Sequence, residues 1–323
     1  MSDGRRGEFD LIAALFAPLA AGDSRALGLT DDAALLPAKP GYETAVTTDT
    51  MVAGVHFLET EAPGLVARRL LRVNLSDLAS MGAEPDGYFL NLSVPASTSD
   101  AWLEGFAGAL GDDQKAFGVA LLGGDTTSTP GPTTLSVTML GSVPAGTAIR
   151  RAGASPGDIL MVSGTIGDAA LGLSDLSAGK ADRPYLVARF QTPEPRLALG
   201  AELRGIASAM ADVSDGLVAD TGHICEASGL QAEIVAAAIP LSDDAAAAVA
   251  AGETDISALA TGGDDYELVF AVPPANREAA FSAGFAAGVD VTEIGLFGAG
   301  EGVTLRGPDG RLLEMAKAGY RHF

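Results

Sequence analysis

Short runs of apolar and β-branched residues alternate with segments of helical periodicity along the whole chain, and this alternation sets the class of fold. In the first half we expect helices at 8–19, 63–81 and 100–117, and strands at 44–52, 87–94, 119–122 and 133–143. In the second half we expect strands at 158–164, 209–213, 231–235, 266–272 and 290–297, and helices at 166–178, 184–190, 195–206, 217–228, 242–251 and 275–284. This order of elements predicts an α/β (α+β) fold in which helices pack on mixed sheets.

A turn-rich stretch, PAGTAIRRAGASPG at 144–157, separates the two halves of the chain. The 323 residues are enough for two domains of ordinary size, each with its own core. We therefore expect an N-terminal domain at 1–145 and a C-terminal domain at 146–323.

The chain is strongly acidic, because 42 Asp and Glu residues against 20 Lys and Arg residues give a net charge of −22. This balance excludes a nucleic-acid partner, whose phosphates require a basic face. A solvated acidic surface accounts for most of the excess. The positions of the aspartates therefore carry more information than their number.

The sequence disfavours membrane, secretory and thiol chemistry. No apolar run reaches the roughly 18 residues of a membrane span, and no apolar signal core follows the N-terminal MSDGRRGEFD. Cys225 is the only cysteine, which excludes an intrachain disulfide and a thiolate zinc cluster. His56, His223 and His322 are too scattered to indicate a histidine metal site. We expect a cytoplasmic protein with no membrane partner.

Aspartate is concentrated with Gly, Ser and Thr in six segments, at 30–32, 47–50, 74–77, 123–127, 212–216 and 262–267. Several of them follow strand-like runs, and ligands of α/β sheets gather outside strand ends. Mg²⁺ prefers oxygen ligands, and it would offset the repulsion between clustered carboxylates. We therefore expect a multi-magnesium site that accepts a polyphosphate, formed by Asp32, Asp49, Asp77 and Asp125.

A single aspartate in a turn has a competing interpretation as a turn or helix cap. Asp31, Asp220 and Asp265 are candidates for that role. The number of aspartate segments nevertheless favours metal chemistry for the set as a whole.

The familiar nucleotide-binding motifs are absent from the sequence. It contains no Walker A loop, no HRD and DFG pair, no G-x-S-x-G elbow and no H-E-x-x-H helix. ATP would have to be held by the aspartate segments instead. Arg150 and Arg151 at the domain junction could bind phosphate oxygens, or form a solvated linker pair. His56 could reach a phosphate, or be a structural histidine.

Ten strings, in the same order as in the family, give the chain a resemblance to the thiamine-monophosphate kinases. They are GEFDLI, DDAALL, TTDTMVAGVHF, VNLSDLASMGAEP, LLGGDTT, RRAGASPGD, SGTIGDAALGL, DVSDGLVADTGHI, GGDDYEL and GYRHF. This family belongs to a superfamily with aminoimidazole ribonucleotide synthetase, selenophosphate synthetase and a hydrogenase-maturation protein. The resemblance covers residues 7 to 323.

The resemblance implies a two-domain aminoimidazole ribonucleotide synthetase-like fold and a homodimer formed by the N-terminal domain. It also implies that ATP and thiamine monophosphate react to give ADP and thiamine diphosphate, by direct in-line transfer with several Mg²⁺ ions. Matching motifs imply metal ligands at Asp32, Thr47, Thr48, Asp49, Asp77, Asp125, Asp212 and Asp215. They imply ATP contacts at Gly124, Asp125, Arg151 and Ser214, and substrate contacts at His56, Asp264 and Tyr320.

Two residues depart from the family pattern. Thr30 stands where the family has glycine, and Asp264 stands where glutamate is usual. Phe323 is a second candidate for the aromatic contact assigned to Tyr320.

Three alternative functions remain open from the sequence. They are a related synthetase, a non-catalytic protein that binds divalent ions, and a metal-dependent phosphohydrolase. The AGVHF and DYEL contexts fit the synthetase poorly.

Overall fold

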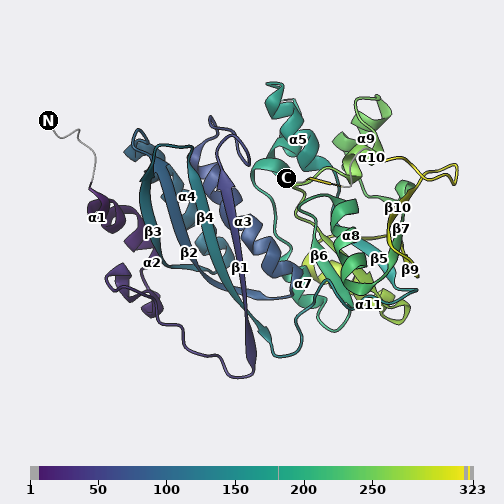
Figure 1. Cartoon of the computed structure of the whole chain (residues 1–323), viewed down its shortest axis with the longest axis horizontal. Helices are drawn as coiled ribbons and strands as arrows, with labels where there is room; N and C mark the ends of the chain where they lie inside the picture. The colour runs from purple at the N-terminus through teal and green to yellow at the C-terminus, as the bar shows by residue number, and fades with distance from the viewer. Residues whose placement is uncertain (1–6, 181, 316–318, 321–323) are drawn as a thin grey trace. The chain divides into compact units, whose positions relative to one another are not determined.

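The computed structural model describes residues 7–180, 182–315 and 319–320, and divides into two compact units (Figure 1). The first unit comprises the residues up to 78 together with 84–145. The second comprises 79–83 and the residues from 146 onward. Each unit contains a mixed sheet with helices packed on it, so the predicted fold class is confirmed.

The first unit is built on a four-stranded sheet. Its strands lie in the order β1 (Tyr42–Val52), β4 (Thr134–Pro144), β2 (Glu84–Pro95) and β3 (Ala120–Thr129). The β1–β4 and β4–β2 pairs are antiparallel, and the β2–β3 pair is parallel. Helices α3 (Pro63–Ser80) and α4 (Asp100–Phe117) cover one face of this sheet (Figure 1).

The period of two along the strands explains which face is covered. On β2 the alternate residues Tyr88, Leu90 and Leu92 are buried. On β1 the alternate residues from Thr44 to Thr50 are turned away from the helices, and Val46 among them is 61% exposed. Helix α4 begins at Asp100 because the Ser99 hydroxyl accepts the N–H of Trp102, and it ends where Gly118 adopts a left-handed conformation.

The N-terminal segment differs from the single helix expected at 8–19. The chain forms a short helix α1 (Glu8–Leu11), a π-helical turn η1 (Ile12–Phe16) and a second short helix α2 (Ala17–Ala20). Pro18 lies inside this last helix and lacks the N–H that a continuous helix would need. A 3₁₀ segment, η2 (Ser24–Leu29), follows.

The second unit is built on a six-stranded sheet. Its strands lie in the order β10 (Gly302–Arg306), β7 (Gln231–Val235), β9 (Val291–Gly298), β5 (Ile159–Ser163), β8 (Leu268–Val272) and β6 (Ala209–Asp212). The helices are α5 (Asp168–Ser177), α6 (Pro184–Gln191), α7 (Leu197–Glu202), α8 (Leu217–Ser228), α9 (Asp243–Ala250), α10 (Ile256–Ala260) and α11 (Arg277–Ala287), with 3₁₀ turns η3 (Ala236–Ala238) and η4 (Pro274–Asn276).

The central strands β5 and β8 are buried along their whole length, as their unbroken apolar runs predict. One core cluster includes Val162, Ile224 and Ile294, a second includes Met161 and Phe270, and a third includes Leu186 and Leu259. The sequence analysis expected neither β10 nor α10. No helix within the described ranges is long and apolar enough to cross a membrane.

Candidate metal and nucleotide site

Strand β1 and helix α3 bring three of the predicted metal ligands together. Thr47 and Asp49 lie on the inward face of β1, and the Thr47 hydroxyl donates a hydrogen bond to Asp77 of α3. Asp49 also shares a hydrogen bond with Asp77. Burial, followed by the charge and the hydrogen bond of Asp77, raises the pKa of Asp49 to about 7. The sequence therefore folds here into a half-buried group of oxygen donors with excess negative charge.

Thr48 points to the other face of β1, because successive side chains of a strand alternate. Its hydroxyl donates to the carbonyl of Val137 at 3.0 Å and accepts from the Thr138 hydroxyl at 3.2 Å. The structure therefore does not group the Thr48 side chain with those of Thr47 and Asp49.

A second group of predicted residues lines a cavity of about 430 Å³ in the first unit. The N-terminal segment supplies an apolar wall that includes Ile12 and Phe16. Strands β2 and β3 and the 31–34 segment supply the rest, with Asp32 and Asp125 among the acidic lining residues. The cavity thus combines an apolar surface with carboxylates, a combination that suits a nucleotide whose phosphates carry a metal ion.

The four carboxylates that the sequence analysis groups together lie in two places within one chain. Asp49 is on β1 and Asp125 is on β3, which are the opposite edge strands of the first sheet. Three strand spacings of about 4.8 Å separate these edges. We also expected the aspartates at strand ends, but Asp49 and Asp125 lie inside their strands.

Gly124, a predicted ATP contact, is required by the packing of the sheet. A Cβ atom at this position would lie 1.9 Å from the carbonyl oxygen of Leu90 on β2. Gly124 therefore permits the close approach of β3 to β2 that places Asp125 on the cavity wall.

His56 is oriented by a turn that follows β1. Its ring Nδ1 accepts the backbone N–H of Val52 at 3.0 Å, and the backbone N–H of His56 donates to the Val52 carbonyl. The neutral ring therefore carries its proton on Nε2. The role predicted for His56 thus falls to the Nε2–H group as a donor.

In the second unit, the end of β6 and the loop that leads to α8 carry Asp212, Ser214 and Asp215. Asp212 is the last residue of β6 and is 3% exposed. Asp215 and Arg151 both lie close enough to Asp220 of α8 for their charges to change its pKa. Burial and then the charge of Asp215 raise the pKa of Asp220 to about 7, while backbone N–H groups and Arg151 act in the opposite direction.

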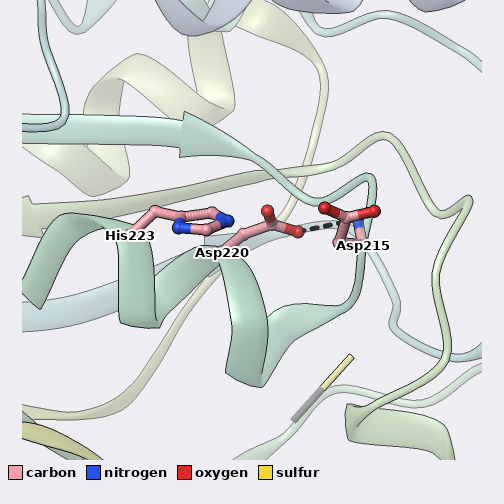
Figure 2. Close-up of side chains that lie close together, drawn as sticks. All are labelled: Asp215, Asp220 and His223. Atoms are coloured by element: carbon pink, nitrogen blue, oxygen red, sulfur yellow. Dashed lines mark hydrogen bonds between the residues drawn. The ribbon is translucent and has the colours of Figure 1, made fainter. Parts of the chain in front are cut away.

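The sequence analysis missed His223. Ligand atoms of Asp215, Asp220 and His223 lie within 4.8 Å of one another (Figure 2). Asp220 and His223 are three residues apart and so share a face of α8. That spacing was the signal available in the sequence. It was missed because the three histidines were compared only with one another and not with nearby aspartates.

Two aspartates that we predicted as turn or cap residues accept backbone N–H groups near helix starts. Asp220 accepts the N–H of Ser214, the first of three such bonds, and Asp265 accepts the N–H groups of Gly167 and Ala169 at the start of α5. Neither aspartate occupies the N-cap position, because the N-caps of α8 and α5 are Gly216 and Gly167 and neither cap makes a side-chain bond. The capping interpretation is therefore wrong in its local form: Asp220 binds these N–H groups from inside α8, and Asp265 binds them from a distant segment.

The predicted substrate contacts of the second unit lie on two other segments, which backbone hydrogen bonds hold against the same loop. The N–H of Asp264 donates to the carbonyl of Ser214 at 2.8 Å, and the N–H of Tyr320 donates to the carbonyl of Asp215 at 3.1 Å. Tyr320 is 50% exposed. The alternative aromatic, Phe323, lies outside the described residues.

Family models match both units. AIR synthase related protein, N-terminal domain, matches residues 30–143, and AIR synthase related protein, C-terminal domain, matches residues 155–307. Together with the two mixed sheets, these matches define the class as a two-domain AIR synthase related protein.

The relatives narrow this class. Thiamine-monophosphate kinase of Caulobacter vibrioides is 49% identical over 98% of this chain and 90% of its own length. The solved structure of thiamine-monophosphate kinase from Stenotrophomonas maltophilia has a TM-score of 0.84 at 39% identity, covering 95% of this chain and 98% of that one. AaThiL complexed with AMPPCP and TMP has a TM-score of 0.79 at 29% identity, covering both chains completely. The chain belongs to the thiamine-monophosphate kinase family.

Proposed function

We propose that this chain transfers the γ-phosphoryl group of ATP to thiamine monophosphate, giving ADP and thiamine diphosphate. Relatives named thiamine-monophosphate kinase match the chain over nearly its full length. The AaThiL complex with AMPPCP and TMP supports a nucleotide and a phosphorylated thiamine as the two ligands. The proposal includes a cytoplasmic location, where ATP is available.

The contact between Asp49 and Asp77 is the observation that carries this proposal. Burial and then the charge of Asp77 raise the pKa of Asp49, so two ionised carboxylates here are costly unless a cation offsets their charge. The Thr47 hydroxyl adds a neutral oxygen, so the donor set suits Mg²⁺. When bound, several Mg²⁺ ions would supply the positive charge that the phosphate oxygens of both substrates require.

The side chains in this proposal bind and orient rather than carry protons. The acceptor is a phosphate oxygen that is already ionised near neutral pH, so in-line attack needs no general base. His56 agrees with this, because its Nδ1 already accepts the N–H of Val52 and is not available as a base. Arg151 adds a positive charge next to Asp220 that a phosphate oxygen can share.

The proposal also includes a homodimer, and the sheet order gives it a physical reason. Within one chain, Asp49 and Asp125 lie on opposite edges of the first sheet. A second copy that places its β3 edge near β1 would join the two carboxylate groups into one metal site. Val46, exposed on β1, would be covered in the same contact.

Incubation of the purified chain with ATP, Mg²⁺ and thiamine monophosphate tests the activity. We expect ADP and thiamine diphosphate in equal amounts. Inorganic phosphate without an acceptor product would indicate a phosphohydrolase, and divalent-ion binding without ADP would indicate a binding protein. Either result would overturn the proposal.

Subunit mixing tests the shared site. Asp49→Asn and Asp125→Asn should each abolish turnover alone. If each site uses Asp49 of one copy and Asp125 of the other, mixed dimers contain one intact site, and mixing should restore up to a quarter of wild-type activity when subunits exchange at random. Sedimentation measures the dimer directly. A monomer, or dimers that exchange subunits without recovering activity, would refute the shared site.

A further inference from the structure

Three successive amides converge on one buried carboxylate at the start of α8. The N–H groups of Ser214, Asp215 and Gly216 donate to Oδ2 of Asp220 at 3.0, 3.0 and 3.1 Å, and Figure 2 shows the bond from Asp215. Successive N–H groups of this kind form a nest that binds an anion. Asp220 is 1% exposed, so water cannot easily take its place. The chain thus fills its own anion nest.

The carbonyl groups of the same loop hold two other segments. As described above, Ser214 accepts from Asp264, and Asp215 accepts from Tyr320. We call residues 213–216 the hub loop, because its N–H groups bind Asp220 and its carbonyl groups bind these two segments. The four residues joined by these two bonds, Ser214, Asp264, Asp215 and Tyr320, are all predicted to contact nucleotide, metal or substrate.

Close packing and backbone strain leave these segments little freedom to move relative to the hub loop. A Cβ at Gly263 would lie 2.4 Å from the Ser214 carbonyl oxygen, and one at Gly319 would lie 2.7 Å from that of Asp215. Asp264 has a φ of +73°, a conformation that its surroundings must enforce. A displacement of the hub loop should therefore reach both segments.

We propose that Asp220 is a positioning residue for phosphoryl transfer, which acts by holding the hub loop and through it the predicted ATP contact and substrate contacts. The proposal rests on the proposed function, because it takes the roles of those residues from it. The proposal also means that the Asp220 carboxylate occupies the anion nest formed by the N–H groups of residues 214–216. A substrate phosphate must therefore bind elsewhere than on these three amides.

Kinetics of Asp220→Ala and Asp220→Asn test the assignment. The alanine variant removes the acceptor of all three bonds, and we expect KM for ATP and for thiamine monophosphate each to rise about tenfold or more, equivalent to about 1.4 kcal/mol per tenfold. The asparagine variant keeps one oxygen acceptor and should recover part of the loss. This shared rise of two KM values is not expected from a general loss of stability.

Asp158→Ala is the matched control. Asp158 is also a buried carboxylate of the second unit, 4% exposed, and it accepts hydrogen bonds from the Ser155 N–H and the Ser208 hydroxyl. Its replacement should lower the melting temperature without raising either KM in the folded protein.

Hydrogen exchange gives a readout that does not depend on turnover. In both Asp220 variants the amides of Asp264 and Tyr320 should exchange faster than in the wild type and in the control. Unchanged KM values and unchanged exchange at these two amides would overturn the proposal; if the alanine variant fails to fold, the asparagine variant decides by the same measures. An inactive wild-type protein would refute the proposed function instead, and exchange would still test the hub loop.

Discussion

The carboxylates of Asp49 and Asp77 share a hydrogen bond, although one lies on strand β1 and the other on helix α3. Thr47 donates to the same Asp77 carboxylate. Burial and the nearby negative charge raise the pKa of Asp49 to about 7, so the pair is strained in the absence of a cation. This contact lets stability and activity be separated by mutation.

Asp49→Asn should stabilise the metal-free protein while abolishing its activity. Removing one charge relieves the repulsion, and since one pKa unit corresponds to about 1.4 kcal/mol, we expect a gain of about 1 kcal/mol or more. Turnover should fall about a hundredfold or more, as for other losses of charge stabilisation. Thermal unfolding in EDTA and the coupled assay measure the two effects.

Magnesium provides the control for this variant. The wild-type melting temperature should rise when Mg²⁺ is added, and that rise should be much smaller for Asp49→Asn. Near-normal turnover with unaltered magnesium dependence would contradict the metal assignment.

Gly124→Ala should destabilise the first unit. Its Cβ would collide with the Leu90 carbonyl, so β3 must move away from β2, at a cost of about 1–3 kcal/mol or more. Gly108→Ala is the matched control, because Gly108 lies in α4 with nothing within 4 Å of the added Cβ, and this change should stabilise the helix by about 0.5–1 kcal/mol. Equal midpoints of denaturant unfolding for the two variants would refute this reason for the glycine.

The sequence predicted local structure well where periodicity was long and clear. Helix α4 was expected at 100–117 and is found from Asp100 to Phe117, because Ser99 and Gly118 give local capping signals. Strand β3 was expected to end at 122 but continues to Thr129. Its two glycines, Gly123 and Gly124, lie inside the strand and allow close approach to β2.

Pairing between distant segments was beyond the sequence. The GVTLR segment of β10 is short, and it becomes a strand because it pairs in parallel with β7, some 70 residues earlier in the chain. The separation of Asp49 from Asp125 follows from strand order, which no local pattern encodes. The motifs indicated which residues belong to the site, but the sheet topology determines which of them meet within one chain.

Asp265 should make stability depend on pH. Burial raises the pKa of Asp265 to about 8 in the folded protein, against 3.8 as the ordinary value. Between these values the folded state binds more protons than the unfolded state, so the contribution of Asp265 is complete below about pH 4 and declines as the pH rises to about 8.

Asp265→Asn isolates this effect, because asparagine does not titrate. The free energy of unfolding of the wild type minus that of the variant should fall steadily from pH 4 to pH 8, then level off. Denaturant unfolding at each pH gives this difference. A flat or rising difference would show that Asp265 remains ionised in the folded protein.

Glu267 should be the most sensitive charged residue of the second unit. It is fully buried, and its carboxylate accepts from Arg189 at 2.8 Å, from Arg196 at 2.5 and 2.7 Å, and from the Ser163 hydroxyl at 2.6 Å. Glu267→Gln removes the charge that offsets two guanidinium groups, and breaking a buried ion pair in this way costs about 3–5 kcal/mol. Glu194→Gln is the control: Glu194 also contacts Arg196, but its side chain is 70% exposed, and the change should cost about 0.5 kcal/mol or less. The midpoints of denaturant unfolding compare the two variants. A Glu267→Gln midpoint close to that of Glu194→Gln would mean that the buried network around Glu267 does not stabilise the second unit.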